Sequence, residues 1–367
     1  MKHQNDRRVK LNENLRVGIL GAGWAGGGHA AAFSRLPNVQ VVALWSRTRN
    51  SAETLAAQLN EPRLKVYDDW RDLVEQAEVD VISLATPPTF RVEPIVTALD
   101  RGCHVLIEKP VTVGLKGAED IREAVRQNDI VTATVLNWRY APGNLTAKRA
   151  IEEGQIGNIL DVSAEWRINW MSAEFIEQRP WTKDFAISDG ILGEGVSHDL
   201  DRIRFLTGQD FKRVVSKLVS RPLAGVPNVE LDGGNSIILA ELTNSIIADI
   251  QLTLMVGMPK WEQIISGETG TLKVTHETTF LHDLEVDEAK ALDTLDSDKV
   301  PEGTDLLQHT WNRLIADFVK AIRIDDKARN KVPNLPTFDD GLKVQQTISA
   351  ALMSDKESRW VNLDELK

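Results

Sequence analysis

The segment EGVSHDLD at residues 194–201 surrounds one histidine, His198, with three carboxylates, Glu194, Asp199 and Asp201. In a helical segment, Glu194, His198 and Asp201 share one face because they are spaced i, i+4 and i+7. An imidazole has an ordinary pKa of about 6.5, so His198 can accept and return a proton near neutral pH. The residue types therefore predict either a proton-transfer site or an ordinary acidic start of a helix.

The second interpretation of this segment involves no chemistry. Ser197 can cap a helix that ends at Gly208, and Asp199 then interacts favourably with the positive end of the helix dipole. The two interpretations are compatible, since a capped helix can present its first turn to a substrate. A zinc site is disfavoured because the sequence has no second histidine or cysteine at ligand spacing from His198.

The segment RVGILGAGWAGGGHAAAF places Gly21, Gly23 and Gly26 in G-x-G-x-x-G spacing between a predicted strand and an Ala-rich helix. The first glycine permits a tight turn, the second lets the backbone approach a pyrophosphate, and the third lets helix and strand pack closely. Phosphates bind at the positive end of such a helix. The spacing predicts a dinucleotide-binding turn, and we expect His29 in this helix to be packed or exposed rather than catalytic.

The residues after the second predicted strand indicate which dinucleotide binds. Where an acidic side chain would bind the ribose 2′-hydroxyl, the sequence has Ser46, followed by Arg47 and Arg49. The missing carboxylate removes repulsion against a 2′-phosphate, and guanidinium groups bind phosphate in charge-assisted pairs. We predict that NADP(H) is the preferred cofactor, with NAD(H) as the alternative. The residues predicted to contact the cofactor are Gly21, Gly23, Trp24, Ala25, Gly26, Ser46, Arg47, Arg49, Thr86, Pro87, Glu108 and Lys109.

A second reactive group, Lys109, follows the buried run in HVLIEKPVTV. The predicted strand ends at Glu108, and doubly wound sheets bind ligands at the carboxyl ends of their strands. We expect Lys109 to face the nicotinamide, where its charge would stabilise a developing alkoxide. A cis Lys109–Pro110 bond is compatible with this turn. The interpretation requires that folding brings Lys109 and His198 together beside the nicotinamide ring.

The first part of the chain alternates short apolar runs with helical patterns, which predicts an α/β fold with a doubly wound parallel sheet of the Rossmann type. The predicted strands cover residues 16–20, 39–45, 79–86, 103–108 and 130–135. The predicted helices cover residues 51–59, 70–77, 92–102 and 115–128.

The second part has longer predicted strands joined by short polar links at 243–245 and 267–270, which favours a large, mostly antiparallel open sheet. The predicted strands cover residues 159–170, 212–221, 236–242, 245–256, 262–267, 271–276, 279–286 and 359–363, with helices at 144–154, 306–322 and 338–354. We expect a loose N-terminal tail at 1–14, a Rossmann domain at 15–140 and an α+β domain for substrate binding and oligomerisation at 141–367.

Composition limits the partners of this 367-residue chain. With 42% apolar and 26% charged residues, it is typical of a soluble protein with two globular domains. A net charge of −11 disfavours a nucleic-acid partner. The polar N-terminus has no apolar signal segment, and the single Cys103 excludes an internal disulfide or a multi-cysteine metal site. We expect a cytoplasmic protein without a membrane segment or a bound metal.

Several segments resemble the glucose–fructose oxidoreductase/inositol dehydrogenase (Gfo/Idh/MocA) family in order and spacing across nearly the whole chain. They are GAGWAG, ATPPTF, GCHVLIEKP, NWRYAPG, GILGEGVSHDLDRIRFLTG and PTFDDGLKVQQTISAALMS…RWVNL. The resemblance implies a Rossmann domain and an α+β domain whose open sheet forms an oligomer interface, here in a homodimer or homotetramer. It also implies oxidation of a sugar or polyol hydroxyl, or reduction of the corresponding carbonyl.

By this resemblance, Lys109 and His198 are the catalytic pair. Glu194 stands where the family has aspartate, so the resemblance gives it the role of orienting and electrostatically biasing His198, with one extra methylene. Asp201 matches the acidic residue three positions after the histidine. Arg91 replaces the histidine of the pattern TPPxxH, and we expect it to alter contacts near the cofactor rather than abolish chemistry.

The substrate side is less specific. Trp166, Trp170 and Trp181 offer indole faces on which sugar rings can stack, although Trp166 and Trp170 fit sheet core or interface positions equally well. Asn137 is expected near the cleft, and Arg139 would bind an anionic substrate group or tie the two domains together. The residues predicted to contact the substrate are Lys109, Arg139, Trp181, Glu194, His198 and Asp201.

The sequence therefore predicts an NADP(H)-preferring oxidoreductase acting on a secondary hydroxyl or carbonyl of a sugar, polyol or related small molecule. Two alternatives have the same fold: a redox-neutral nicotinamide-dependent glycosidase and a non-catalytic NADP(H)-sensing regulator. The E-K-P segment and His198 disfavour the regulator, because a sensor has no need of a proton shuttle.

Overall fold

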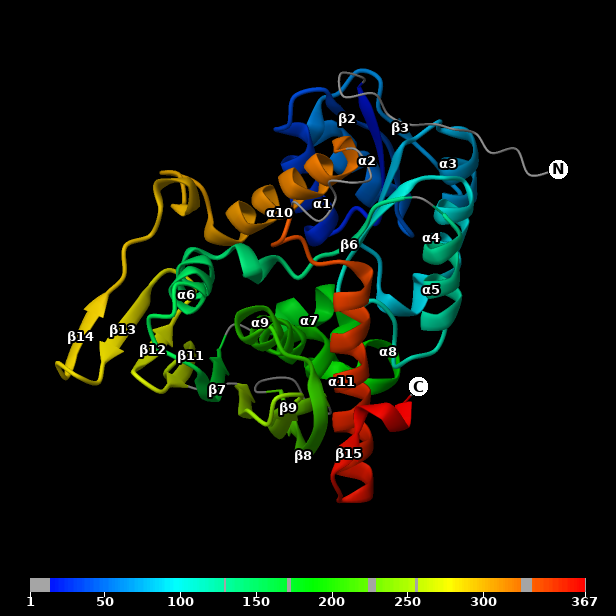
Figure 1. Ribbon diagram of the computed structural model, residues 1–367. Helices are drawn as coiled ribbons and strands as arrows, with labels where there is room; N and C mark the ends of the chain where they lie inside the picture. Colours follow the sequence, from blue (N-terminus) through cyan, green and yellow to red (C-terminus); the bar gives the residue numbers. More distant parts are fainter. Residues whose placement is uncertain are drawn as a thin grey trace. The chain divides into compact units, whose positions relative to one another are not determined.

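The computed structural model of the chain describes residues 14–128, 130–169, 173–223, 229–254, 257–324 and 332–366. Trp170 and residues 1–13 of the expected tail lie outside the described residues. The chain divides into two compact units. In Figure 1 the colours follow the sequence, so the first unit combines blue and cyan segments with the orange helix α10 (Leu306–Arg323). The first unit comprises residues 1–112, 116–137 and 304–340, and the second comprises residues 113–115, 138–303 and 341–367.

The first unit contains a six-stranded parallel sheet in the order β3-β2-β1-β4-β5-β6. Its strands are β1 (Leu15–Leu20), β2 (Val39–Trp45), β3 (Lys65–Val66), β4 (Val81–Leu84), β5 (His104–Ile107) and β6 (Thr132–Thr134). Every residue of β4 and β5 is buried, as expected of strands with covered faces. The order reverses between β1 and β4, and this reversal is the place where doubly wound sheets bind ligands. The predicted Rossmann fold is confirmed.

Helices connect these strands and cover the sheet. They are α1 (Trp24–Ser34), α2 (Arg49–Leu59), α3 (Trp70–Gln76), α4 (Val92–Asp100) and α5 (Ala118–Gln127), with a 3₁₀ turn η1 (Pro88–Phe90) before α4. The 3₁₀ turn η2 (Asn137–Tyr140) follows β6 and contains the boundary between the units. The strand β3 was not predicted, because two residues without an apolar run give no periodic signal.

One long helix from late in the chain, α10 (Leu306–Arg323), belongs to the first unit. This differs from the expected division, which assigned all residues from 141 onward to the α+β domain. The physical reason is a close contact with α1: a Cβ on Gly28 would lie 2.1 Å from the Trp311 ring, so the bare glycine makes room for the indole. Gln308 Nε2 also donates to the Gly28 carbonyl at 3.1 Å.

The second unit contains a nine-stranded sheet in the order β14-β13-β12-β11-β7-β10-β9-β8-β15. Among the described strands of this sheet, β7 and β10 pair in parallel and the other neighbours pair antiparallel, so the predicted mostly antiparallel sheet is confirmed. The strands are β7 (Ile159–Ile168), β8 (Phe211–Pro222), β9 (Glu230–Leu242), β10 (Ile247–Leu254), β11 (Lys260–Gly267), β12 (Gly270–Val274), β13 (Thr279–Asp283), β14 (Glu288–Ala291) and β15 (Val361–Asn362).

The predicted strand at 279–286 is in fact shorter and is followed by a turn and β14. The turn contains Asp287 with a φ of 50°, and the Asp283 carboxylate accepts from the Glu285 amide at 2.9 Å. His282 also contacts the Asp287 carboxylate at 2.9 Å across the turn. The apolar residues Leu284 and Val286, which made the run look continuous, are exposed in this turn.

The helices of the second unit pack against one face of its sheet, while the other face remains open. They are α6 (Pro142–Glu152), α7 (Ala173–Gln178), α8 (Phe185–Ser188), α9 (Ser197–Thr207) and most of α11 (Phe338–Glu357), with shorter turns η3 (Pro180–Lys183), η4 (Leu192–Val196), η5 (Asp296–Asp298) and η7 (Leu363–Leu366). The alternation is clear in β10, where Ala248, Ile250 and Leu252 are buried and Ile247 is exposed. Within the described ranges, no helix is both long and apolar enough to cross a bilayer.

Candidate active site

The glycine-rich turn of the first unit has the shape required to hold a pyrophosphate. Gly21 has a φ of 102°, and a Cβ on Gly26 would lie 1.9 Å from the Gly21 carbonyl oxygen, so both positions require glycine. Around Gly23, by contrast, no described atom lies within 4 Å of an added Cβ. Gly23 precedes α1 without a side-chain cap, which leaves the positive end of the helix available to an anion. These residues fit a dinucleotide.

Trp24 and Ala25 lie in the first turn of α1. Trp24 is 59% exposed and meets Trp311 edge to face, with ring centroids 5.0 Å apart. Ala25 is half-buried. An exposed indole beside an open glycine turn is positioned to contact a bound dinucleotide.

The end of β2 presents Ser46, Arg47 and Arg49 as the sequence predicted, but Arg49 already has partners. Its Nε donates to Glu53 at 2.7 Å, and its Nη1 contacts the Asp68 carboxylate. These two carboxylates raise the pKa of Arg49. Arg47 is exposed and Ser46 is half-buried. A 2′-phosphate would therefore compete with Asp68 for the Arg49 guanidinium.

The residues after β4 and β5 lie at the carboxyl edge of the sheet. Lys109 is half-buried, its backbone amide donates to Glu108 Oε2 at 3.0 Å, and the Lys109–Pro110 bond is cis. Thr86 is buried, and its hydroxyl has no hydrogen-bond partner among the described residues. Pro87 next to it is half-buried. An unpartnered buried hydroxyl at this edge is compatible with a ligand that supplies the missing partner.

Arg91 connects these two strand ends. It is buried, its Nε donates to the Thr86 carbonyl at 2.8 Å, and its Nη1 contacts the carbonyls of Glu108 and Pro110. Carbonyls at both strand ends therefore share one guanidinium, which has five donors in a rigid plane. Arg91 therefore links the carbonyl oxygens after β4 with those after β5, and its effect on the cofactor stays a prediction.

In the second unit, the segment around His198 is helical throughout, but Ser197 does not cap it. Five residues, Leu192–Val196, form the π-helical turn η4, which continues directly into α9. The residue before α9, Val196, is itself helical, and Ser197 Oγ donates backwards to the Gly193 carbonyl at 2.8 Å. The predicted cap is therefore wrong, because the backbone is already helical at that point. The predicted end at Gly208 is confirmed by its left-handed φ of 68°.

The π turn also changes the predicted spacing of the acidic face. Glu194 lies inside η4, so the regular α-helical spacing begins only at Ser197 and relates His198 to Asp201. Glu194 is half-buried, and its charge opposes the lowering of the pKa of Arg179 that burial causes. Glu194 and Arg179 are thus electrostatic neighbours in this unit.

The other two carboxylates of the segment form buried ion pairs. Asp201 accepts two hydrogen bonds from Arg139, at 2.8 Å from Nε and 2.6 Å from Nη2. Asp199 pairs with Arg202 one turn along α9. Burial raises the pKa of Asp199 despite this pair and lowers the pKa of Arg202 to about 10. Asp199 lies in the first turn of α9, as the helix-dipole interpretation requires, and it is also a buried ion-pair partner.

Aromatic residues that were not predicted as site residues lie near His198. Trp138 meets His198 edge to face with centroids 6.4 Å apart and stacks on His276 at 3.9 Å. The Arg202 guanidinium lies 3.3 Å from the centroid of Trp261. Burial lowers the pKa of His276 well below its usual value, and the charges of Arg202 and His198 lower it further. Trp138 lies inside the NWRY segment, but nothing local in the sequence connects Trp261 or His276 to His198.

The predicted substrate tryptophans lie in different surroundings. Trp166 of β7 packs against the π turn, since a Cβ on Gly195 would lie 1.8 Å from its ring. It pairs across the sheet with Trp261, which makes it a packing residue beside the Glu194 turn. Trp181 is half-buried in η3. Asn137 is buried in the first unit and donates to the Thr310 hydroxyl at 2.6 Å.

Two family descriptions match the chain over most of its length. The oxidoreductase family with an NAD-binding Rossmann fold (Gfo/Idh/MocA) matches residues 15–135, and the C-terminal alpha/beta domain of the same family matches residues 148–363. The chain belongs to this oxidoreductase family. The resemblance that the sequence segments indicated is therefore confirmed. Among the described residues, no cluster of three or more His, Cys, Asp or Glu could hold a metal ion.

Named relatives in this family include sugar dehydrogenases. A levoglucosan dehydrogenase from Pseudarthrobacter phenanthrenivorans is 28% identical over 209 residues, covering 54% of this chain and 52% of the relative. The match thus spans about half the length of that relative. A glucose-6-phosphate 3-dehydrogenase from Bacillus subtilis is 24% identical over 353 residues, covering 94% and 97%. A solved levoglucosan dehydrogenase in complex with NADH and levoglucosan shares the fold, with a TM-score of 0.81 at 21% identity over 96% of this chain and 100% of that one.

Proposed function

We propose that this protein is an NAD(P)-dependent oxidoreductase that transfers hydride between the nicotinamide and a secondary hydroxyl or carbonyl of a sugar, polyol or related small molecule. The observation that supports this most is the half-buried Lys109 just beyond the carboxyl end of β5 in an NAD-binding fold. The names of its relatives, which include levoglucosan and inositol dehydrogenases, support the substrate class.

In the oxidative direction, His198 removes the proton from the substrate hydroxyl as the carbon loses its hydride and the C–O bond becomes a carbonyl. Lys109 stabilises the negative charge that develops on the substrate oxygen. Glu194 orients His198 and biases it electrostatically. The bound nicotinamide supplies the hydride acceptor in this direction and the hydride donor in reverse.

Replacing either proposed catalytic residue should abolish turnover without removing the cofactor. We expect Lys109→Ala and His198→Ala to lower kcat by about two to four orders of magnitude, because charge stabilisation and proton transfer each contribute on that scale. NADPH affinity, measured by fluorescence titration, should change little. Lys116→Ala and His282→Asn, both at exposed or partly exposed positions, are matched controls. Unchanged turnover in Lys109→Ala or His198→Ala would contradict the assignment.

Cofactor reduction in proportion to product separates a dehydrogenase from a redox-neutral glycosidase.

For the cofactor, we propose a preference for NADP(H) over NAD(H). Ser46 introduces no charge against a 2′-phosphate, and the exposed Arg47 can pair with one. We expect Arg47→Ala to weaken NADPH binding by about tenfold while leaving NADH binding nearly unchanged, since an exposed charge-assisted contact contributes about 1.4 kcal/mol or less. Asp68→Asn should improve NADPH binding by releasing Arg49. Tighter binding of NADH than NADPH to the unmodified protein would reject this preference.

We also propose that the substrate contacts Lys109, Glu194, His198 and Trp181. Arg139 and Asp201 were predicted as further substrate contacts, but their side chains bind each other as a buried pair. The half-buried indole of Trp181 offers an apolar face to sugar C–H groups. Trp181→Leu should raise KM for the sugar more than it lowers kcat, which steady-state kinetics would show.

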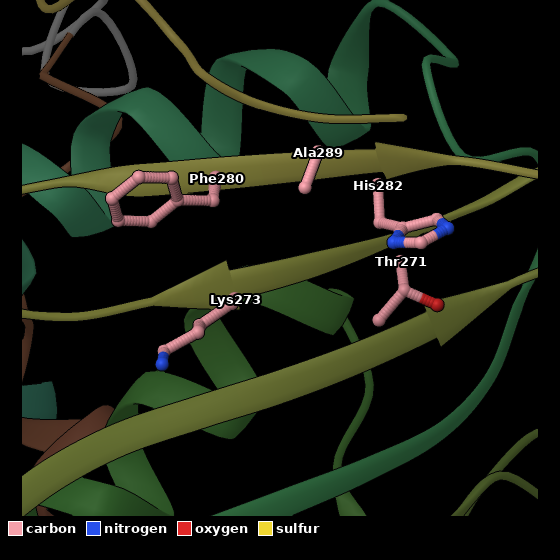
Figure 2. Close-up of a pocket in the computed structure, with 5 residues that line it drawn as sticks. All are labelled: Thr271, Lys273, Phe280, His282 and Ala289. Carbon is pink, nitrogen blue, oxygen red and sulfur yellow. The ribbon is translucent and has the colours of Figure 1, made fainter. Parts of the chain in front are cut away.

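Finally, we propose a homo-oligomer assembled through the open face of the nine-stranded sheet. Ile237 and Leu239 of β9 and Ile247 of β10 are exposed on this face. Figure 2 shows the same face at β12, β13 and β14, where Lys273 and Phe280 are direct neighbours and Thr271, His282 and Ala289 form an adjacent row. An exposed sheet face with this apolar content is typical of a protein–protein contact.

A further inference from the structure

A buried histidine of the first unit contacts the residue immediately before Lys109. His29 of α1 is fully buried, with Nδ1 at 3.0 Å from Ser83 Oγ and Nε2 at 3.2 Å from Glu108 Oε1. An ionised carboxylate can only accept hydrogen bonds, so the Nε2 proton of His29 points at Glu108. We expected His29 to be packed or exposed rather than catalytic; it is packed, and both of its ring nitrogens contact polar partners.

The other oxygen of Glu108 reaches the backbone of Lys109. Glu108 Oε2 accepts from the Lys109 amide at 3.0 Å, so the carboxylate bridges the His29 ring and the main chain at position 109. Arg91 contacts the carbonyls on both sides, at Glu108 and Pro110. The backbone that bears the Lys109 side chain is therefore held at its amide by Glu108 and at the flanking carbonyls by Arg91.

Burying the His29–Glu108 pair costs desolvation free energy, which packing alone does not require. A buried carboxylate and imidazole lose their hydration, and apolar residues of similar volume often serve the fold equally well. Here the pair is also covered from α10, where Trp311 meets His29 edge to face with centroids 5.8 Å apart. Two neighbouring helices thus keep water away from a polar contact that ends at the backbone of the proposed catalytic lysine.

We propose that His29 is a positioning residue for Lys109, acting through Glu108 to fix the backbone from which the ammonium group projects. This inference rests on the proposed function, because a fixed position of Lys109 matters for the rate only if Lys109 acts on the substrate in that reaction. A shift of the ammonium by about 1 Å is enough to lower the rate on the order of 100-fold when charge must be placed on a developing oxyanion.

The inference also predicts a change in pH dependence. Burial raises the pKa of Glu108, but the hydrogen bond and charge of His29, together with the charges of Lys109 and Arg91, hold it below its usual value. These are the groups that face Glu108 from α1, from the segment before α4 and from its own turn. If His29 is lost, burial is less fully opposed and the pKa of Glu108 rises. As the pH falls, the Glu108 carboxylate is then protonated, and so loses its charge, at a higher pH than in the unmodified protein.

Two substitutions separate this role from simple packing. The amide of glutamine reaches roughly the position of Nε2, whereas the amide of asparagine reaches only that of Nδ1. His29→Gln therefore keeps a donor for Glu108, and His29→Asn keeps only the Ser83 contact. His104→Asn is the matched control. His104 is also buried in the first unit, but its Nδ1 accepts a hydrogen bond from the Val131 amide at 2.9 Å.

One measurement is the rate of amide hydrogen exchange in the peptide that contains Lys109, made on the full chain. The other is steady-state kinetics with NADP+ and a sugar substrate, which gives kcat, KM and their pH profile. We expect His29→Asn to speed exchange at Lys109, to lower kcat by about 10- to 100-fold with little change in KM, and to move the acid limb of the profile to higher pH. His29→Gln should recover most of the exchange protection and kcat, and His104→Asn should change none of these.

The outcomes distinguish this inference from the proposed function. Unchanged exchange at Lys109 in His29→Asn, or equal losses in His29→Asn and His29→Gln, would overturn the positioning role whether or not a substrate is found. If the unmodified protein binds NADPH yet oxidises no sugar or polyol, the proposed function fails, while the exchange data still decide whether His29 fixes the backbone at Lys109.

Discussion

At the scale of single residues, the buried carboxylates of the second unit differ in how well their charge is compensated. Asp201 receives two hydrogen bonds from Arg139, a planar cation whose donors match a carboxylate. Asp189, only 2% exposed, accepts from the Gly114 amide at 3.2 Å and from Gln345 Nε2 at 2.7 Å. Both partners of Asp189 are neutral, so burial dominates and raises its pKa.

This difference predicts that Asp189→Asn stabilises the protein at neutral pH. The substitution removes a poorly compensated charge, asparagine tolerates the left-handed φ of 56° at this position, and Gln345 can rotate its amide so that its unpartnered Oε1 accepts from the new side chain. We expect a gain of about 1 kcal/mol in the free energy of unfolding, the size of one buried hydrogen bond. Urea unfolding of both proteins measures it.

The pH dependence of this gain has a definite sign. Because the pKa of Asp189 is higher in the folded than in the unfolded protein, the folded state binds more protons between the two pKa values, and its stability falls as pH rises through that window. The penalty is fully present above the folded pKa and disappears below the unfolded value of about 3.9. The advantage of Asp189→Asn should therefore shrink as the pH falls toward 4, and an advantage that is constant with pH would contradict the explanation.

At the scale of elements, the glycine-rich turn offers a comparison between neighbouring positions. Gly23 and Gly27 both have room for a Cβ, since nothing lies within 4 Å of one at Gly23 and only Leu55 lies 4.0 Å from one at Gly27. Gly27 is inside α1, where alanine favours the helix by up to about 1 kcal/mol. Gly23 is where a pyrophosphate would approach the backbone.

We therefore expect Gly23→Ala to fold normally but to lose cofactor affinity. Gly27→Ala should fold normally and keep its cofactor affinity. Titration with NADPH should show at least about tenfold weaker binding for Gly23→Ala, the equivalent of about 1.4 kcal/mol. Thermal unfolding without cofactor should give a Tm for Gly23→Ala close to that of the unmodified chain. Equal NADPH affinity in the two variants would argue against a dinucleotide at this turn.

Elements with strong local signals could be predicted from the sequence, and those determined by distant contacts could not. The runs that became β1, β2, β4 and β5 are apolar because both faces of the sheet are covered. The strands β3 and β14 have no such run. At the π turn η4, the Trp166 ring packs against Gly195, a contact between residues far apart in the sequence. No periodic pattern around Ser197 predicted this π turn, so the helical backbone that excludes the predicted cap was not expected.

The candidate site shows the same division. Lys109, His198 and the three glycines of the turn could be found because their spacing is local. The contact of His29 with Glu108 joins α1 to the end of β5, and the grouping of Trp138, Trp261 and His276 depends on the register of a nine-stranded sheet. Such contacts follow from the folded topology, which no short segment specifies.

At the scale of the whole molecule, the open face of the second unit's sheet carries several exposed apolar side chains, among them Ile237, Leu239 and Ile247. A stable interface buries about 800 Å² per partner, and a sheet of nine strands is wide enough to supply that area. Charged pairs on the same face, such as Lys260 with Glu165 and Arg213 with Glu241, lie between the exposed apolar side chains. Such a mixture of apolar and polar groups is compatible with a contact between protein subunits.

The oligomer proposal predicts that a charge on this face dissociates the protein without unfolding it. Ile237 is 53% exposed on β9, so Ile237→Lys should cost less than about 0.5 kcal/mol of stability within one chain, yet it would bury an unpaired charge in the interface. Light scattering after gel filtration should show a multiple of 40.9 kDa for the unmodified protein and a shift toward 40.9 kDa for Ile237→Lys. Val286→Lys is the matched control, because Val286 is 62% exposed in the turn before β14 rather than on the sheet face. A monomeric unmodified protein, or equal dissociation by both variants, would show that this face does not form the interface.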